Sequence, residues 1–266
     1  MITDEQHPTV STIFNLLNDW RHLPFYSLET RSAPFFAVFM REILKAKFGN
    51  EIHEILIPEF PLRIGSLYDA EERNKLWSDG GPSEDQSYNV DYVAFEKGEN
   101  RKTAYFVELK TDMGSRRDAQ DRYLCDAREK TLRCFVAGIE KLARASNKKQ
   151  KYVHLLHLLA APGIELVSPP NDTRLYDKTF PHVVKGWSTA MDELNFDTLR
   201  FSDIRVVFIQ PIKSETNEHG FEHIYFDQIA SIVERRGDIG AMFANYLKQW
   251  TESAGSRVPR DIPFRT

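Results

Sequence analysis

Residues 89–110, NVDYVAFEKGENRKTAYFVELK, decide the fold of this chain. Two runs rich in β-branched and aromatic residues, 89–95 and 103–110, flank a polar segment that contains Gly98 and Asn100. Such runs are typical of β-strands, and a short polar segment with glycine and asparagine is typical of a turn. The stretch therefore predicts two antiparallel strands joined as a hairpin.

The segments around the hairpin predict helices and further strands. Helical spacing of apolar residues predicts helices over 10–20, 34–48, 115–145, 183–194 and 239–250. Strand patterns cover 152–160, 205–210 and 221–226, and residues 54–63, interrupted by two prolines, predict an irregular or edge strand. We therefore expect an α/β fold in which helices flank a mixed central sheet. Residues 1–266 are expected to form one domain with an N-terminal helical extension and a C-terminal elaboration.

The composition of the chain excludes several classes of protein. Its 266 residues are 41% hydrophobic and 28% charged, which is typical of a globular domain. No apolar run approaches the roughly 18–20 residues that span a bilayer, and the polar N-terminus does not resemble a secretory signal. Cys125 and Cys134 are the only cysteines, and both fall on the predicted helix 115–145. We expect a cytoplasmic protein without membrane association.

Basic residues are concentrated in one part of a chain whose net charge is −4. Residues 101–151 contain 14 Lys and Arg but only seven Asp and Glu. A basic segment in an otherwise acidic chain is able to follow a polyanion such as nucleic acid. The alternative is a solvated helix face with interspersed salt bridges.

Three ionisable residues of the hairpin indicate chemistry. Alternation along a strand directs Glu108 and Lys110 to the same side, and Asp91 on the neighbouring strand meets Glu108 if register and face agree. Charges in so apolar a strand are costly unless they pair or bind a metal. The alternative is an ordinary ion pair on an exposed edge strand.

Two carboxylates and an amine at one sheet face suit a hard cation. Mg²⁺ prefers oxygen ligands, and one or two carboxylates with a substrate phosphate satisfy it. The backbone carbonyl of Leu109 is a further candidate ligand. A lysine at this place can orient the attacking water and stabilise charge that develops on the phosphate oxygens.

The segments VDYVAF (90–95) and FVELK (106–110) resemble the motif of the PD-(D/E)XK nuclease superfamily, which has the restriction-endonuclease-like fold. The resemblance implies an αβββαβ core, dependence on Mg²⁺ or Mn²⁺, and hydrolysis of phosphodiester bonds. It assigns metal binding to Asp91 and Glu108 and makes Lys110 the catalytic lysine. The sequence departs from the motif at Val90, where the family has proline.

The same resemblance implies accessory residues on two helices. Glu42 is the candidate for the family's acidic residue on the first core helix. Gln120 matches the glutamine that RecB-like nucleases carry after the lysine strand, and Tyr123 follows three residues later where the usual spacing is four. Each of these is equally explained as an ordinary polar or packing residue. Arg116 and Arg117, at the start of that helix, are placed to hold phosphate.

The sequence thus predicts a Mg²⁺- or Mn²⁺-dependent nuclease, a hydrolase acting on DNA in preference to RNA, and it is compatible with a homodimer. A non-catalytic module of the same fold, binding nucleic acid or protein, is the alternative. An unrelated α/β enzyme acting on a small molecule is a third hypothesis, which predicts no metal site between Asp91 and Glu108. The aromatic residues Trp77, Tyr88, Tyr92 and Tyr123 either stack on unpaired bases or pack within the protein.

Overall fold

A computed structural model describes ten ranges of the chain, and the statements below concern these residues. They are 10–20, 27–77, 81–98, 103–112, 116–146, 151–152, 155, 158–159, 201–213 and 219–255. Among them, no helix is both long enough and apolar enough to cross a bilayer.

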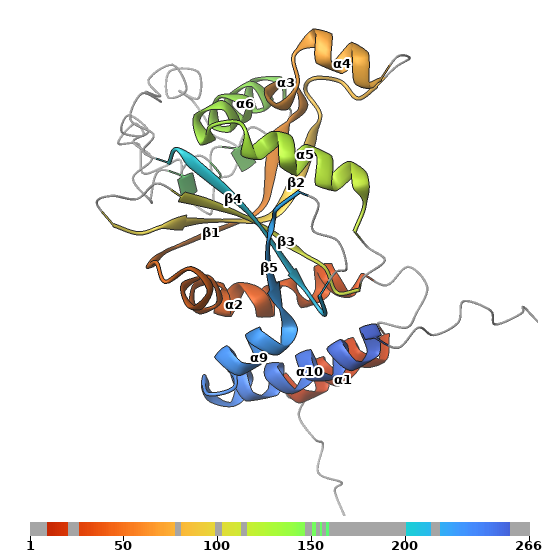
Figure 1. Ribbon diagram of the computed structural model, residues 1–266, viewed down its shortest axis with the longest axis vertical. Helices are drawn as coiled ribbons and strands as arrows, with labels where there is room; N and C mark the ends of the chain where they lie inside the picture. The colour runs from red at the N-terminus through yellow and green to blue at the C-terminus, as the bar shows by residue number, and fades with distance from the viewer. Residues whose placement is uncertain are drawn as a thin grey trace, which may run out of the picture. The chain divides into compact units, whose positions relative to one another are not determined.

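Five strands form one mixed sheet in the order β1-β2-β3-β4-β5 (Figure 1). Their bounds are Ile52–Arg63, Ser87–Glu96, Thr103–Leu109, Asp203–Gln210 and Glu222–Tyr225. The first three strands are antiparallel neighbours, whereas β4 and β5 pair in parallel. The predicted hairpin and the α/β class with a mixed sheet are therefore confirmed. The strand with two prolines is the edge strand β1, where a missing backbone donor is tolerated.

The chain divides into two compact units, and each is built from separated segments. Unit 1 contains residues 1–49, 109–117 and 207–266, and unit 2 contains residues 50–108 and 118–206. Each unit is described by itself below.

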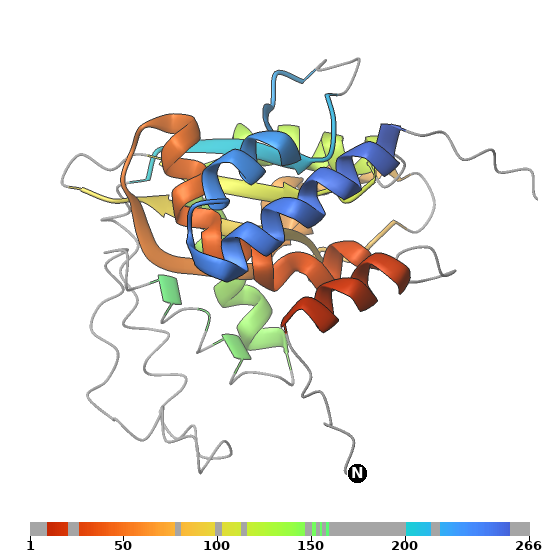
Figure 2. The ribbon, with the colours of Figure 1, turned by 90° about the horizontal axis from the view of Figure 1, so that it is seen from below.

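Unit 1 is a group of helices packed through aromatic rings. Helix α1 (Val10–Trp20) lies beside α10 (Gly237–Gly255), and α9 (Phe226–Val233), which the sequence did not predict, precedes α10 (Figure 2). The Tyr246 hydroxyl donates to Asn15 Oδ1 at 2.6 Å. The ring of Phe243 packs edge-on against Phe36, with the centroids 5.0 Å apart. Burial of such large rings is the main stabilising contribution in this unit.

Helix α2 (Leu28–Phe48) starts earlier than the apolar spacing predicts. The side chain of Ser27 caps the helix by accepting from the Thr30 backbone N–H, so Pro34 lies inside the helix rather than in its first turn. Gly49, at φ +77°, ends the helix as expected. The predicted start at residue 34 was wrong because proline was given more weight than the serine cap.

In unit 2, two helices replace the single helix predicted over residues 115–145. They are α5 (Asp118–Arg128) and α6 (Leu132–Ala145), and Thr131 caps the second by accepting from the Cys134 backbone N–H. The two cysteines are free and lie on different helices. Phe135 of α6 packs against Phe106 of β3, which holds α6 against the sheet. The short helices α3 (Ile64–Leu67) and α4 (Ala70–Leu76) follow β1.

The later segments agree with the sequence only in part. The strands β4 and β5 and the helix α10 are confirmed. The predicted strand over residues 152–160 is wrong, because the described residues in that range are helical. Over so short a run, its apolar residues fit the spacing of a buried strand as well as the spacing of a helix. The predicted helix over residues 183–194 lies outside the described residues.

Candidate functional site

The register between β2 and β3, continued by one position, would set Asp91 opposite Glu108. The paired positions run from Phe95 and Ala104 to Tyr92 and Val107, and the next position along both strands is Asp91 with Glu108. Opposite residues of an antiparallel pair share a face, with Cβ atoms about 4.5–5.5 Å apart. Both residues belong to unit 2. The meeting of the two carboxylates stays a prediction, which follows if this register continues by one position.

Gln120 contacts the buried carboxylate of this pair. Glu108 is 1% exposed, and its Oε2 accepts a hydrogen bond from Gln120 Nε2 at 2.5 Å. Gln120 lies in the first turn of α5, which carries its amide to the end of β3. A donor at this distance stabilises the ionised form of Glu108 and fixes its orientation. Gln120 and Glu108 are thus bonded within unit 2, while the role that the resemblance implies for Gln120 stays a prediction.

Tyr123, one turn further along α5, lies beside the same carboxylates. Burial raises the pKa of its phenol, the negative charge of Glu108 and that of Asp91 raise it further, and a hydrogen bond with Gln120 opposes the rise. The phenol is therefore neutral at physiological pH. Its ring is 6% exposed, which differs from the open ring that base stacking requires. Nucleic-acid binding by Tyr123 remains a prediction.

On the other side of Asp91, β1 brings Glu59 to the site. Between the pairs Pro58–Tyr92 and Phe60–Val90, the register sets Glu59 opposite Asp91. In the described ranges Glu59 is the only residue other than glycine with a positive φ, at 50°. Burial raises the pKa of Tyr92 to about 12, with further contributions from Asp91 and Glu59. The sequence predicted irregularity in this strand but did not single out Glu59.

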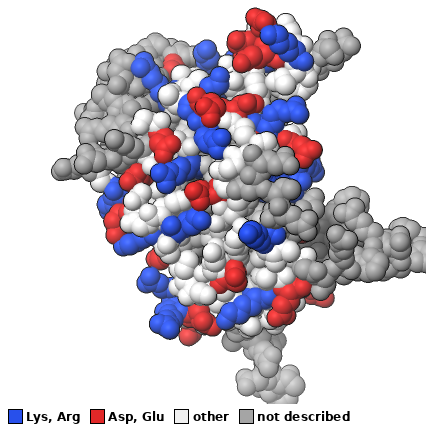
Figure 3. All heavy atoms as spheres, in the orientation of Figure 1, with Lys and Arg blue, Asp and Glu red and all other residues white. Residues whose placement is uncertain are grey.

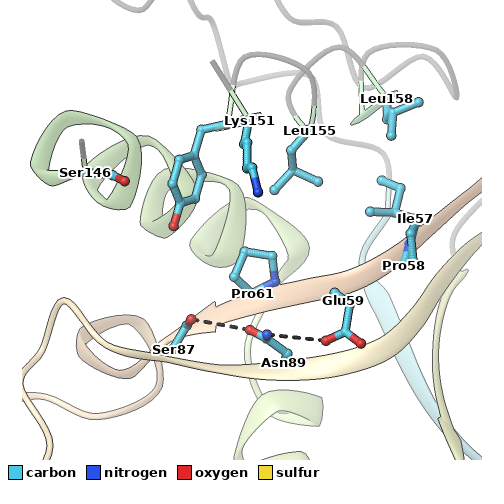
Figure 4. Close-up of a pocket in the computed structure, with 11 residues that line it drawn as sticks. Ile57, Pro58, Glu59, Pro61, Ser87, Asn89, Ser146, Lys151, Leu155 and Leu158 are labelled. Atoms are coloured by element: carbon cyan, nitrogen blue, oxygen red, sulfur yellow. Dashed lines mark hydrogen bonds between the residues drawn. The ribbon is translucent and has the colours of Figure 1, made fainter. Parts of the chain in front are cut away.

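Glu59 also borders a hollow of about 470 Å³ in unit 2. Its carboxylate accepts from Asn89 Nδ2 at 3.4 Å, and Ser87 contacts Asn89 in turn (Figure 4). Lys151 points into the hollow from the opposite wall (Figure 4). The remaining wall is mostly apolar and includes Ile57, Pro58, Pro61, Leu155 and Leu158.

In unit 1, Lys110 contacts an acid that the sequence did not predict. Lys110 is 4% exposed, its backbone N–H donates to the Ile209 carbonyl, and its Nζ lies 3.7 Å from Glu29 Oε1. Glu29 is in the first turn of α2. Glu42 is half-buried on the same helix, about 20 Å further along its axis at 1.5 Å per residue. The acid beside Lys110 is therefore Glu29 and not Glu42. Sequence analysis missed it because the helix start was set after residue 29.

Arg116 and Arg117 directly precede α5, as the sequence predicts. The guanidinium of Arg116 lies over the ring of Phe208, 4.6 Å from its centroid, within unit 1. Arg117 is exposed. Their contact with phosphate and the role of the Leu109 carbonyl as a metal ligand stay predictions.

The donor set of unit 2 fits a hard divalent cation. Within the described ranges, no three His, Cys, Asp or Glu side chains gather as a metal-binding group. Mg²⁺ is satisfied by one or two carboxylates when water and substrate oxygens complete its shell, so a pair is a sufficient protein contribution. Two carboxylates placed opposite each other also repel, and a cation between them removes that repulsion.

One face of the described residues is mixed in charge (Figure 3). On the face shown in Figure 3, basic and acidic side chains alternate over the coloured residues. Any preference of this face for a polyanion therefore depends on individual cations and not on a continuous basic area.

Comparisons of the chain with protein-family models, with curated proteins and with solved structures found no match. The function of the protein therefore has to be inferred from its own residues.

Proposed function

We propose that the protein is a divalent-cation-dependent nuclease that hydrolyses phosphodiester bonds in DNA. The observation that supports this function best is the register that, continued by one position, would set Asp91 opposite the buried Glu108, with Gln120 bonded to Glu108. Paired carboxylates at the end of an apolar strand are costly unless they hold a cation. The resemblance of VDYVAF and FVELK to the PD-(D/E)XK motif supports the same function.

Asp91 and Glu108 would hold Mg²⁺ or Mn²⁺, with the carbonyl oxygen of Leu109 as a third protein ligand. When bound, the cation supplies an activated water and neutralises charge on the phosphate. Gln120 would hold Glu108 in a fixed orientation, because its amide donates to one carboxylate oxygen.

Lys110 would position the attacking water. It follows Glu108 by two residues, and alternation along an extended chain directs the two side chains to the same side. Its ammonium donates hydrogen bonds to the water and to the phosphate oxygens on which negative charge develops. Glu29 restrains the amine, since burial leaves it little freedom and the carboxylate lies 3.7 Å away. Arg116 and Arg117 would contact neighbouring phosphates.

Cleavage assays test this function directly. The purified chain is incubated with supercoiled plasmid and with single-stranded DNA, in Mg²⁺, in Mn²⁺ and in EDTA. We expect cleavage with either cation and none in EDTA. Asp91→Asn and Lys110→Met should each lower the rate by at least about a hundredfold. Lys141→Met, which alters an exposed lysine of α6, is the matched control and should cleave as the wild type does.

Two outcomes would contradict the proposal. If Lys110→Met cleaved as fast as the wild type, the activity would come from a contaminant or from another site. If the wild type bound DNA but cleaved neither DNA nor RNA with either cation, a non-catalytic binding module would be supported instead.

A further inference from the structure

Two tyrosines of unit 2 form a parallel ring stack beside the carboxylates. The ring centroids of Tyr88 and Tyr123 are 4.4 Å apart, and the ring planes differ by 4°. Tyr123 is buried, whereas Tyr88, at the start of β2, is half-buried and forms the more exposed end of the stack. Tyr88 is thus a flat ring that a rigid neighbour holds in place, which lowers the entropy lost when a third ring stacks on it.

The stack is close to the carboxylates in space as well as in sequence. Tyr88 precedes Asp91 by three residues on β2, and the negative charges of Glu108 and Asp91 both act on the hydroxyl of Tyr123. A planar group stacked on Tyr88 would therefore lie near the proposed cation site.

Arg122 connects the stack with a hollow of unit 2. Arg122, exposed on α5, acts electrostatically on both Tyr88 and Tyr68, opposing the rise in pKa that burial causes in each. Arg122 and Tyr68 line a hollow of about 440 Å³, to which Lys75 and Lys130 also contribute.

The acids of this hollow are in part already bound by the protein. Asp126 Oδ2 accepts from the Tyr68 hydroxyl at 2.7 Å, and Glu72 accepts from the Asp69 backbone N–H at 2.9 Å. These contacts leave Arg122 as the side chain best placed to meet an anion next to Tyr88. The hollow therefore combines the ring of Tyr68, the guanidinium of Arg122 and space for a nucleotide, and Arg122 relates it to Tyr88.

We propose that Tyr88 stacks on a base of an unpaired DNA strand while Arg122 contacts an adjacent phosphate, so that single-stranded DNA is the substrate of this site. The inference rests on the proposed function, because it names the substrate class of the same site. In a duplex, each base already stacks on its neighbours and faces its partner strand, so its face cannot reach a side chain. An unpaired strand offers its base faces freely, and stacking on an aromatic side chain tolerates every base.

Equilibrium binding in EDTA tests the inference without cleavage. Fluorescence anisotropy would compare a labelled single strand, the blunt duplex of the same sequence, and a single strand made of abasic nucleotides. We expect the full chain to bind the single strand more tightly than the duplex. Tyr88→Ala should weaken single-strand binding by roughly 5- to 100-fold, whereas Tyr88→Phe, which keeps the ring, should bind like the wild type.

The abasic strand makes the test independent of the folding of any variant. It should bind the wild type more weakly than the normal strand, and Tyr88→Ala should bind both strands about equally. Arg122→Gln should reduce the salt dependence of binding by about one phosphate contact, with Lys141→Gln on α6 as the matched control.

Equal or tighter binding of the duplex would overturn the inference, and so would equal binding of the normal and abasic strands by the wild type. Failure of this inference can be told apart from failure of the proposed function. Tyr88-dependent binding of the single strand without cleavage in Mg²⁺ or Mn²⁺ would reject the nuclease and keep the binding site. Cleavage in Mg²⁺ or Mn²⁺, together with single-strand binding that Tyr88→Ala leaves unchanged, would keep the nuclease and reject the binding site.

Discussion

At the scale of single residues, the hydrogen bond between Gln120 and Glu108 offers a test of the proposed cation site. Replacing Gln120 with Leu removes the donor while keeping the helical residue, so the buried carboxylate loses its orientation. Losing a donor of this kind weakens metal affinity or activity by 10- to 100-fold. We expect the Mn²⁺ concentration for half-maximal cleavage to rise by about that factor.

Titration of cleavage with Mn²⁺ measures this effect. Gln86→Leu, at an exposed position before β2, is the matched control and should titrate as the wild type does. An unchanged midpoint in Gln120→Leu would mean that Glu108 does not bind the cation.

Because His223 is buried, the stability of the protein should depend on pH. Burial lowers its pKa to about 4, and the positive charges of Arg116 and Lys47 contribute while Glu222 opposes them. Among the described residues, neither ring nitrogen has a hydrogen-bond partner. Because the unfolded chain binds the proton near pH 6.5 and the folded chain does not, stability should fall as the pH drops from about 6.5 to 4.

The loss would reach at most about 3 kcal/mol at the acid end of this window. Denaturant unfolding at pH 7 and at pH 5 measures it. His223→Phe should lose less stability between these two values than the wild type, while the control His219→Phe should behave as the wild type does. Equal losses in the wild type and His223→Phe would show that His223 does not cause the pH dependence.

At the scale of elements, the edge strand β1 contains local strain. Glu59 has φ +50°, a conformation that costs a residue with a Cβ roughly 1–2 kcal/mol and costs glycine little. Glycine also gains more freedom in the unfolded chain, which offsets about 0.5–1 kcal/mol. Glu59→Gly should therefore raise the free energy of unfolding by about 0.5–1 kcal/mol.

Chemical denaturation of Glu59→Gly against Glu54→Gly, an exposed position in the same strand, checks this expectation. Glu54 does not have a positive φ, so glycine there should destabilise the protein. Destabilisation of similar size at both positions would show that Glu59 is not strained.

The sequence correctly predicted those elements that depend on short stretches of neighbouring residues. The hairpin follows from two apolar runs and a turn, and its register, continued by one position, would place Asp91 opposite Glu108 without further information. The break between α5 and α6 was missed because residues 129–131, which end with the cap Thr131, contain neither glycine nor proline. Residues 152–160 were misassigned because a short apolar run suits a buried strand as well as a helix.

At the scale of the whole molecule, the division into two units could not be predicted. Unit 1 assembles three stretches of chain, and its contact between Glu29 and Lys110 joins residues far apart in sequence. The spacing of apolar residues does not reveal this contact, because the contact depends on where α2 begins and on how the segment after β3 packs. The resemblance implied an acidic residue on the first core helix, for which Glu42 was the candidate, whereas the acid that contacts Lys110 in unit 1 is Glu29.

This distinction gives the final prediction. Glu29→Gln removes the charge beside the buried Lys110 ammonium while keeping the size of the side chain, so the amine loses its restraint and its counter-charge. We expect the cleavage rate at saturating Mg²⁺ to fall about tenfold with DNA affinity unchanged, since Glu29 restrains Lys110 and does not contact DNA. Glu42→Gln, the matched change on the same helix, should cleave as the wild type does.

Comparison of kcat with KM separates positioning of Lys110 from weaker substrate binding. Glu29→Gln should lower kcat and leave KM unchanged, and Glu42→Gln should change neither. Both variants are assayed well below their unfolding temperatures, because loss of a charge beside the buried Lys110 should also lower the stability of Glu29→Gln. If Glu42→Gln lost activity and Glu29→Gln kept it, the contact in unit 1 would be structural, and the helical acid of the proposed site would be Glu42.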